Sequence, residues 1–262
     1  SGEVVEVVQF HDRKVILTSV NDGAEEGAPK PVSGDWIGLV WSGRKGASTL
    51  QHVEIRYAGG QAPSGRITGC LWMEDAAPVL ENVSVSSCAA YALSTDLLSE
   101  PELSDFSLDV ADPLKRWELR GSKIETVTSR MLASFETLDG AALDPVITGW
   151  VGTEEKATLT IDAGTKLLFY GGKNAGFYAN GILKINGTQK EPVVMTSWND
   201  ASSGNGKPAA GDWGGLHINR GKPDQTVINW LEIRYAGAVE NTCLRLLEES
   251  PHLENITISH CA

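Results

Sequence analysis

Two pairs of oppositely charged residues have a spacing that sugar chemistry could use. Glu54 and Arg56 stand two positions apart, and Glu232 and Arg234 repeat this arrangement later in the chain. Residues two apart on an extended strand share one face, so each carboxylate could act as an acid or base beside a cation. The duplication favours a simpler interpretation, because an active site seldom needs two identical copies. We interpret both as surface ion pairs, each worth under about 1 kcal/mol.

Two tryptophans are candidates for a ligand platform. Alternation of apolar and polar residues places Trp72 and Trp230 on the outward side of their strands. An exposed indole is a flat apolar surface on which a sugar ring or a protein partner can stack, although isolated exposed apolar side chains are also common without any function. The second repeated segment has Arg245 where the first has Trp72, and the first has His52 where the second has Trp230. These four residues, together with Glu54 and Arg56, form the candidate ligand-binding set.

Two loops rich in oxygen ligands are a candidate calcium site. Calcium takes six to eight oxygen ligands in a flexible geometry. Glu25 and Glu26 add carboxylates to the first loop only, so a site shared by both loops would rest on the flanking aspartates and on carbonyl oxygens. The alternative is that these aspartates cap turns through their side chains. The four aspartates are Asp22, Asp35, Asp200 and Asp212.

Four cysteines occur in two pairs with matched spacing. Cys70 and Cys88 are 18 positions apart, as are Cys243 and Cys261. Matched spacing suggests matched roles. One interpretation is a disulfide between neighbouring layers, formed in an oxidising compartment. The other is a buried free cysteine that packs as a small hydrophobic residue.

The charge of the chain limits its partners. The formal net charge is −12 over 262 residues, and the Lys and Arg residues are not gathered into a basic stripe. A phosphate-binding surface needs such a stripe, so we expect no nucleic-acid partner. No apolar run approaches the roughly 18 residues of a membrane span, so we expect no membrane insertion.

The elements that must position these residues come from an internal repeat. Strings of the first segment recur in the same order about 175 residues later. GDWIGL recurs as GDWGGL, VEIRYAG as LEIRYAG, and PVLENVSVSSC as PHLENITISHC. We predict one continuous body over residues 1–262, with two related blocks at about 7–93 and 184–262 joined by connecting coils.

The repeats consist of short alternating runs that read as strands. The runs are bounded by Gly, Asn, Asp or Pro, and helical periodicity is missing. Similar runs follow one another at steps of about 20 to 25 residues, which is one turn of a solenoid. The pattern therefore predicts an all-β chain built from stacked coils.

Several repeated positions are predicted to be structural. Trp36 and Trp213 each follow a GD turn and begin a strand, so we expect them to plug the wall. Asn82 and Asn255 lie in N-x-S/T sequons at matching places of the two copies. Matching places favour a buried turn position whose amide bonds to the neighbouring coil.

The order of the strings resembles a known family. TLTIDAGTKLLF is followed by GILKINGTQKEPVVMTSWND, GDWGGLHI, LEIRYAG and LENITIS. This order resembles the single-stranded right-handed parallel β-helix of the pectin-lyase-like superfamily. More narrowly, it resembles bacterial secreted and surface proteins that carry GDWGGI-type blocks. The resemblance covers nearly the whole chain and implies the fold far more than the activity, since such proteins include lyases, hydrolases, adhesins and scaffolds.

The resemblance also implies where an enzymatic site would show. Pectate lyases of this superfamily carry a vWiDH-like block, and the related hydrolases carry NTD, DD and GHG blocks. The sequence has none of these, and its nearest string is Ser94, Thr95 and Asp96. No residue is therefore predicted to be catalytic.

These observations predict a non-catalytic β-helix that binds carbohydrate or mediates adhesion at a bacterial surface. The expected partner is a polysaccharide, a surface glycan or a surface protein, and calcium is the one candidate cofactor. A polysaccharide lyase or glycoside hydrolase with an unfamiliar site is the first alternative. The second is a rigid spacer of a longer surface protein, because the sequence starts and stops within the repeated blocks.

Overall fold

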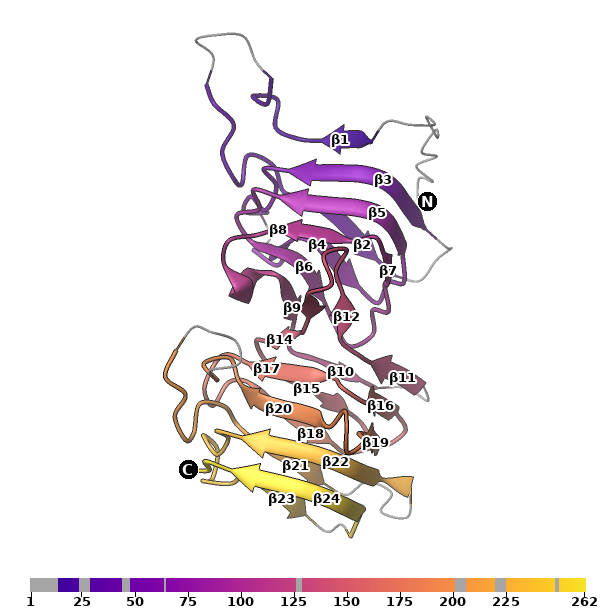
Figure 1. Cartoon of the computed structure of the whole chain (residues 1–262), viewed down its shortest axis with the longest axis vertical. Coiled ribbons are helices and arrows are strands. Elements are labelled where there is room, and N and C mark those ends of the chain that lie inside the picture. The colour runs from indigo at the N-terminus through magenta and orange to yellow at the C-terminus, as the bar shows by residue number, and fades with distance from the viewer. Residues whose placement is uncertain are drawn as a thin grey trace.

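The computed structural model describes residues 14–23, 29–43, 48–63, 65–125, 129–200, 206–219, 225–247 and 250–262. Over these residues the chain is a stack of short strands joined by turns, and its one helical element is the 3-10 turn η1 (Pro113–Lys115). Figure 1 shows the coils following one another along the long axis, from the first coils at the top to the last at the bottom. All pairings between successive coils are parallel. The predicted all-β parallel β-helix is confirmed.

The first column of strands belongs to the N-terminal half. Its members are β1 (Val15–Leu17), β3 (Thr49–Arg56), β5 (Val79–Ser86), β7 (Glu102–Ser104) and β8 (Ser107–Asp109). Strict alternation explains these strands: Val53 and Ile55 are buried, while Glu54 between them is only partly covered. Each strand thus has one apolar face toward the interior.

A second column runs through both halves of the molecule. It contains β2 (Leu39–Ser42), β4 (Gly69–Glu74), β6 (Tyr91–Thr95), β9 (Trp117–Leu119), β14 (Val146–Ile147), β17 (Lys166–Phe169), β20 (Val193–Ser197) and β22 (Val227–Arg234). Because these strands pair without a break, the solenoid wall is continuous from the first repeated segment to the second.

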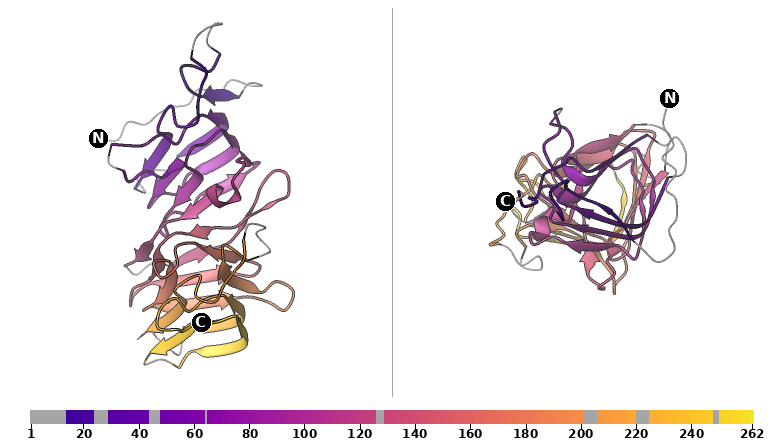
Figure 2. Two further views of the ribbon diagram at one scale, coloured as in Figure 1. Left: turned by 90° about the vertical axis from the view of Figure 1, so that its left-hand side faces the viewer. Right: turned by 90° about the horizontal axis from the view of Figure 1, so that it is seen from above.

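Two further columns complete the C-terminal half. One consists of β10 (Ser122–Ile124), β15 (Trp150–Thr153), β18 (Gly176–Ala179), β21 (Leu216–Asn219) and β23 (Leu244–Leu247). The other consists of β11 (Ser129–Leu132), β16 (Thr158–Asp162), β19 (Ile182–Asn186), the first part of β22, and β24 (His252–Ser259). An antiparallel pair, β12 (Phe135–Glu136) and β13 (Ala142–Leu143), lies at the middle of the chain. Seen from above, the strands outline a closed cross-section (Figure 2).

The two repeated segments occupy different rotational positions. By sequence, β2 and β21 are equivalent, because each follows a GDW string. In the structure β2 lies in the column that continues through β9 and β14 to β17 and β20, whereas β21 lies in the column of β15, β18 and β23. The connecting coils therefore turn the second segment by one face relative to the first.

One apolar core fills the interior of both halves. The buried cluster extends from Leu50 in the first segment to Cys243 in the second. Trp213 is fully buried, its ring stacks on Phe169 with centroids 3.9 Å apart, and its Nε1 donates to the carbonyl oxygen of Arg234 at 2.8 Å. The half-buried Trp36 donates equivalently to the carbonyl oxygen of Arg56 at 2.7 Å. Both tryptophans thus close the wall, as predicted.

Each of the four longest strands bends at its fourth residue. That residue has a positive φ between 50° and 54°, which lets one strand contribute to two faces. Asn82 Nδ2 donates to Nδ1 of His52 at 2.7 Å, so this corner amide bonds to the neighbouring coil. Asn255, by contrast, is exposed and not buried as predicted, because it lies on the last coil described. The four corner residues are His52, Asn82, Trp230 and Asn255.

The structure joins the four cysteines in two disulfides. Cys70 bonds to Cys88 with Cα atoms 6.3 Å apart, and Cys243 bonds to Cys261 with Cα atoms 5.8 Å apart. The first bond links β4 to the segment after β5, and the second links the residue before β23 to the segment after β24. Of the two sequence interpretations, this geometry corresponds to the disulfide.

Candidate functional site

The predicted charge pairs lie in two matching networks. Arg56 Nε donates to Glu54 Oε1 at 2.7 Å, and its NH1 lies 3.2 Å from Asp22 Oδ2. Arg234 likewise contacts Glu232, and its NH1 lies 3.3 Å from Asp200 Oδ2. The hydrogen bond from Arg56 holds the pKa of Glu54 below its usual value. Each arginine therefore ties its strand to the turn of the preceding coil.

The four aspartates of the calcium hypothesis are engaged as hydrogen-bond acceptors. Ser19 Oγ donates to Asp35 Oδ2 at 2.5 Å and Ser197 Oγ donates to Asp212 Oδ2 at 2.6 Å. Asp22 and Asp200 accept from Thr18 and Thr196, both at 2.8 Å. The Ser19 bond is the main cause that lowers the pKa of Asp35.

This arrangement corresponds to turn capping. In the described part of the chain, no three His, Cys, Asp or Glu side chains come together as potential metal ligands. Glu25 and Glu26, which the sequence adds to the first loop, lie outside the described residues. A calcium site built on Asp22, Asp35, Asp200 and Asp212 stays a prediction, and the described contacts of these carboxylates are those of turn caps.

Trp72 is not the exposed platform that alternation predicts. Its side chain points away from the core, yet only 5 % of the residue is exposed. The guanidinium of Arg120 lies over the indole, with Cζ 4.4 Å from the ring centroid. Alternation predicts the direction in which a side chain points, but it does not predict whether the side chain is exposed. Here the guanidinium of a residue from a later coil covers the indole.

Trp230 and His52 lie at strand corners. Trp230 is half-buried and borders a shallow pocket with Glu232 and Asn255. His52 is exposed and accepts the bond from Asn82 described above. These two residues belong to different halves, so the structure does not bring the predicted ligand-binding set together.

A row of aromatic rings lies instead on the outer face of the β15, β18, β21 and β23 column. The indole of Trp150 lies over the glycines of the next coils, since a Cβ atom on Gly176 would come 2.5 Å from Trp150 Cη2. A Cβ on Gly214 would come 2.6 Å from Trp150 Cζ2. Trp150 Nε1 donates to the carbonyl oxygen of Lys173 at 3.1 Å and fixes the ring. Glycine at both positions is what lets the indole lie flat on the wall.

Two more rings continue this row on successive coils. A Cβ on Gly152 would come 2.7 Å from Tyr178 Cδ1, so the phenol ring lies against this glycine. His217 is the register partner of Tyr178, and its ring centroid lies 5.1 Å from that of Trp150. Arg245 follows His217 in the same register. We call Trp150, Tyr178 and His217 the aromatic strip.

The His217 imidazole is buried beside the Trp150 ring. It is 6 % exposed, and within the described residues its Nε2 is buried and has no hydrogen-bond partner. Burial, and secondarily the charge of Arg245, lower the pKa of His217. The lowered pKa favours the neutral imidazole, and the buried unpaired nitrogen is a costly feature of the fold.

Polar groups border the strip along the adjoining row. Tyr178 Oη donates to Glu154 Oε1 at 3.3 Å, and Asn180 Nδ2 donates to Glu154 Oε2 at 3.1 Å. Burial, then the Glu154 charge, raises the pKa of Tyr178 to about 12, so its hydroxyl stays protonated. Asn219 Nδ2 donates to Asn180 Oδ1 at 3.4 Å. Glu154, Asn180, Asn219 and Arg245 line an open cavity of about 390 Å³.

Of the residues predicted to bind ligand, only Arg245 lies at this face. Sequence reasoning missed Trp150, Tyr178 and His217 because it compared the two copies with each other. The available indication was the alternation of aromatic residues with glycines in GWVGT, AGFYA and WGGLH, which successive coils place side by side.

Comparison with known proteins agrees with this architecture. Residues 137–240 match the family model described as a pectate-lyase like beta helix domain. No curated protein and no solved structure matches the chain. The matched residues include the whole aromatic strip. The match supports the resemblance to a β-helix and does not test the narrower resemblance to proteins with GDWGGI-type blocks. Residues 137–240 are thus similar to a pectate-lyase-like β-helix domain, and the parallel coils show the β-helix fold in both halves of the chain.

Proposed function

We propose that the chain binds a neutral carbohydrate along the aromatic strip without cleaving it. The observation that carries this proposal is the Trp150 indole lying flat over the glycines of two successive coils. Sugar rings present flat apolar faces with polar edges, so they pack on aromatic faces while their hydroxyls bond to neighbouring amides and carboxylates.

The dimensions of the strip suit more than one sugar residue. Neighbouring strands in a sheet lie about 4.8 Å apart, so rings on three successive coils cover roughly 10 Å along the solenoid axis. Asn180, Asn219 and Glu154 run parallel to the rings and supply both donors and acceptors. The cavity is lined by Glu154, Glu155 and Arg245, and its charges are paired, since Glu154 lies 3.7 Å from Lys123 Nζ and Arg245 lies 2.9 Å from Glu240. This balance favours an uncharged glycan over an acidic one.

A glycoside hydrolase would need a different arrangement. Hydrolysis of a glycosidic bond commonly uses two carboxylates placed on either side of that bond. At the strip the Glu154 carboxylate already accepts from Tyr178 and Asn180. Its role is therefore to hold the polar row in place, and we keep a lyase or hydrolase activity as an outcome of the test.

A location outside the cell, at a bacterial surface, is part of the same proposal. Disulfides persist in oxidising compartments, and the structure holds two. In the described part of the chain no helix has the length and hydropathy of a membrane span. A rigid solenoid of this kind would present the strip as one fixed surface for adhesion.

A glycan array tests the proposal. The protein should retain a set of neutral oligosaccharides, and the signal should be the same in calcium and in a chelator. In parallel, incubation with neutral and acidic polysaccharides should release no shorter or unsaturated products. Release of products would establish the enzymatic alternative. Absence of any retained glycan, neutral or acidic, would leave only the spacer alternative.

A further inference from the structure

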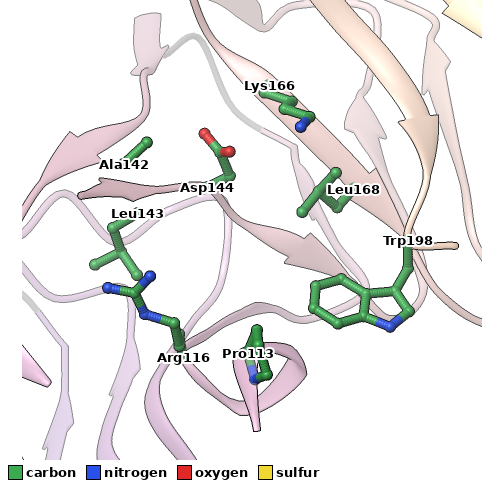
Figure 3. Close-up of a pocket in the computed structure, with 8 residues that line it drawn as sticks. All are labelled: Pro113, Arg116, Ala142, Leu143, Asp144, Lys166, Leu168 and Trp198. Carbon is green, nitrogen blue, oxygen red and sulfur yellow. The ribbon is translucent and has the colours of Figure 1, made fainter. Parts of the chain in front are cut away.

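Pockets also occur on the solenoid outside the aromatic strip. Figure 3 shows one of them, a space of about 190 Å³ to which Arg116, Asp144 and Lys166 give a mixed charge. Another has a volume of about 260 Å³ and lies against Trp230. We call this second space the Trp230 pocket. It differs from the first in that Glu232 is the one ionisable residue among those that line it.

Three successive coils contribute to the Trp230 pocket. The turn between β19 and β20 supplies Gln189 and Pro192, and β22 supplies Trp230. From the last coil described, β24 supplies Asn255 and Thr257. These segments are neighbours because β22 pairs with β19, with β20 and with β24. The pocket is therefore built by the stacking of coils.

Trp230 presents its side chain to this pocket from an unusual backbone position. Its φ of 50° is in the left-handed region, which bulky residues seldom adopt. Asn82 and Asn255 stand at two equivalent corners, and asparagine tolerates this conformation better. The bend of the strand therefore requires a left-handed residue but does not require an aromatic one. Residues held in such conformations cluster at ligand-binding sites, so the indole itself calls for a functional explanation.

The first repeated segment uses the corresponding corner differently. There Asn82 Nδ2 donates to Nδ1 of His52 at 2.7 Å, so the amide and the ring bond to each other. An indole has an N–H donor and no acceptor nitrogen, so Trp230 cannot accept the equivalent bond from Asn255. Within the described residues, the exposed Asn255 side chain makes no hydrogen bond. The second segment thus presents an aromatic ring beside an amide that is open to a ligand.

The other walls combine apolar contact with polar groups. Pro192 and Ile256 are half-buried and give the pocket apolar surface next to the indole. Gln189 and Thr257 are exposed, so their side chains offer hydrogen-bond donors and acceptors at the rim. An aromatic face bordered by amides and a hydroxyl is the surface on which a sugar ring packs, because the ring has an apolar face and polar edges.

Charge and size narrow the choice of ligand. Glu232 forms an ion pair with Arg234, and no cation lines the pocket, so an anion would find no partner there. The volume is below the roughly 300 Å³ at which pockets for drug-sized ligands begin, which suits a single ring. Proline-rich peptides also pack on indoles, but they dock in grooves lined by several aromatic residues. Trp230 is the one aromatic residue that lines this pocket.

We propose that the Trp230 pocket binds one neutral sugar ring, which stacks on the Trp230 indole. The hydroxyl groups of the sugar bond to the amides of Gln189 and Asn255 and to the hydroxyl of Thr257. The pocket borders the column of β20 and β22, whereas the aromatic strip lies on the column of β15, β18, β21 and β23. The two sites are on different faces, so this proposal does not depend on the strip.

Ligand-observed NMR titration of the intact chain tests this site. The neutral probes are the methyl glycosides of glucose, galactose, mannose and N-acetylglucosamine. Glucuronate is the acidic contrast and a decaproline peptide is the peptide contrast. At least one neutral glycoside should bind, and it should bind better than both contrasts.

The variants locate the binding. Trp230→Asn keeps a residue suited to the corner and should weaken the binding of the best glycoside by about tenfold or more. Gln189→Ala removes an exposed amide at the rim and should weaken it by about threefold or more. Tyr170→Ala is the matched control and should bind as the wild type does, because Tyr170 is an exposed aromatic residue outside the pocket.

Four outcomes would overturn the proposal. The first is that no neutral glycoside binds. The second is that glucuronate or decaproline binds better than every neutral glycoside. The third is that Trp230→Asn and Gln189→Ala, folded by circular dichroism, bind the glycoside as well as Tyr170→Ala does. The fourth is that Trp150→Ala removes the binding, because the sugar would then occupy the aromatic strip. Binding that Trp150→Ala retains and Trp230→Asn loses supports this site, whether or not the strip binds glycans.

Discussion

Arg234 places its guanidinium 3.3 Å from the carboxylate of Asp200, which lies 34 residues earlier in the chain. The first segment repeats this contact between Arg56 and Asp22 at 3.2 Å and over the same separation. Both arginines also pair with a glutamate two residues before them. The repeated contact therefore fixes a turn to the strand of the next coil, and the proposed ligand-binding surface lies elsewhere.

The two copies of this contact should differ in strength. Asp200 is buried, whereas Asp22 is partly exposed, so Arg234→Gln removes the ion-pair partner of the more buried carboxylate. We expect Arg234→Gln to lower the free energy of unfolding by about 1 to 3 kcal/mol. Arg56→Gln should lower it by about 0 to 1 kcal/mol. Urea titration of the two variants measures this difference, and a larger loss for Arg56→Gln would show that burial does not rank them.

Acid should destabilise the protein through His217. Burial holds the pKa of this imidazole below its ordinary value in the folded state. The unfolded chain therefore binds a proton first as the pH falls through about 6.5, and the free energy of unfolding decreases. The His217→Gln variant should lose less stability between pH 7.5 and pH 5.5 than the wild type. Identical pH profiles would mean that His217 does not contribute to this dependence.

The Trp230 backbone should be strained. Trp230 has φ of 50°, a left-handed conformation that Asn82 and Asn255 adopt at equivalent corners. Asparagine tolerates this conformation better than an aromatic residue does. Trp230→Asn should therefore keep or raise the melting temperature despite the loss of a large side chain. His52→Ala is the converse variant and should lower it. A clear drop for Trp230→Asn would indicate that packing of the indole outweighs the backbone cost.

The disulfides should stabilise the solenoid locally. Each closes a loop of 18 residues, for which chain entropy predicts about 3 kcal/mol. In a solenoid each coil contacts mainly its neighbours. Replacing Cys243 and Cys261 by alanine should therefore increase hydrogen exchange in β24 while β16 and β19 stay protected. Uniform loss of protection along the chain would instead indicate one cooperative unit.

Much of the fold follows from the sequence, because alternation and repeat spacing are local properties. Val53, Ile55 and Leu231 are buried as their positions in the pattern predict. The rotation between the two segments depends on the connecting coils. These coils occur only once in the sequence, so comparison of the two copies could not predict it. Trp72 shows a further limit, since the covering cation comes from Arg120 two coils later. The aromatic strip depends on which residues of different coils become neighbours, and this register is set by turn lengths.

Glycines below the rings should control the aromatic strip. A Cβ at Gly176 would lie 2.5 Å from the Trp150 ring, so Gly176→Ala must displace the indole. We expect this variant to stay folded and to lose glycan binding. Gly140→Ala places alanine at a φ of 77° away from the strip, so it controls for destabilisation of the backbone without displacement of the indole. Equal binding by both variants would argue against a role for the Trp150 position.

The affinity of Trp150→Ala for the best neutral oligosaccharide from the array is the most direct test of carbohydrate binding at the strip. Tyr170→Ala is the matched control, because Tyr170 is 47 % exposed and does not belong to the strip. Titration calorimetry should show a loss of about tenfold or more for Trp150→Ala and wild-type affinity for Tyr170→Ala. Wild-type affinity of a folded Trp150→Ala variant would contradict the assignment of the strip as the binding site.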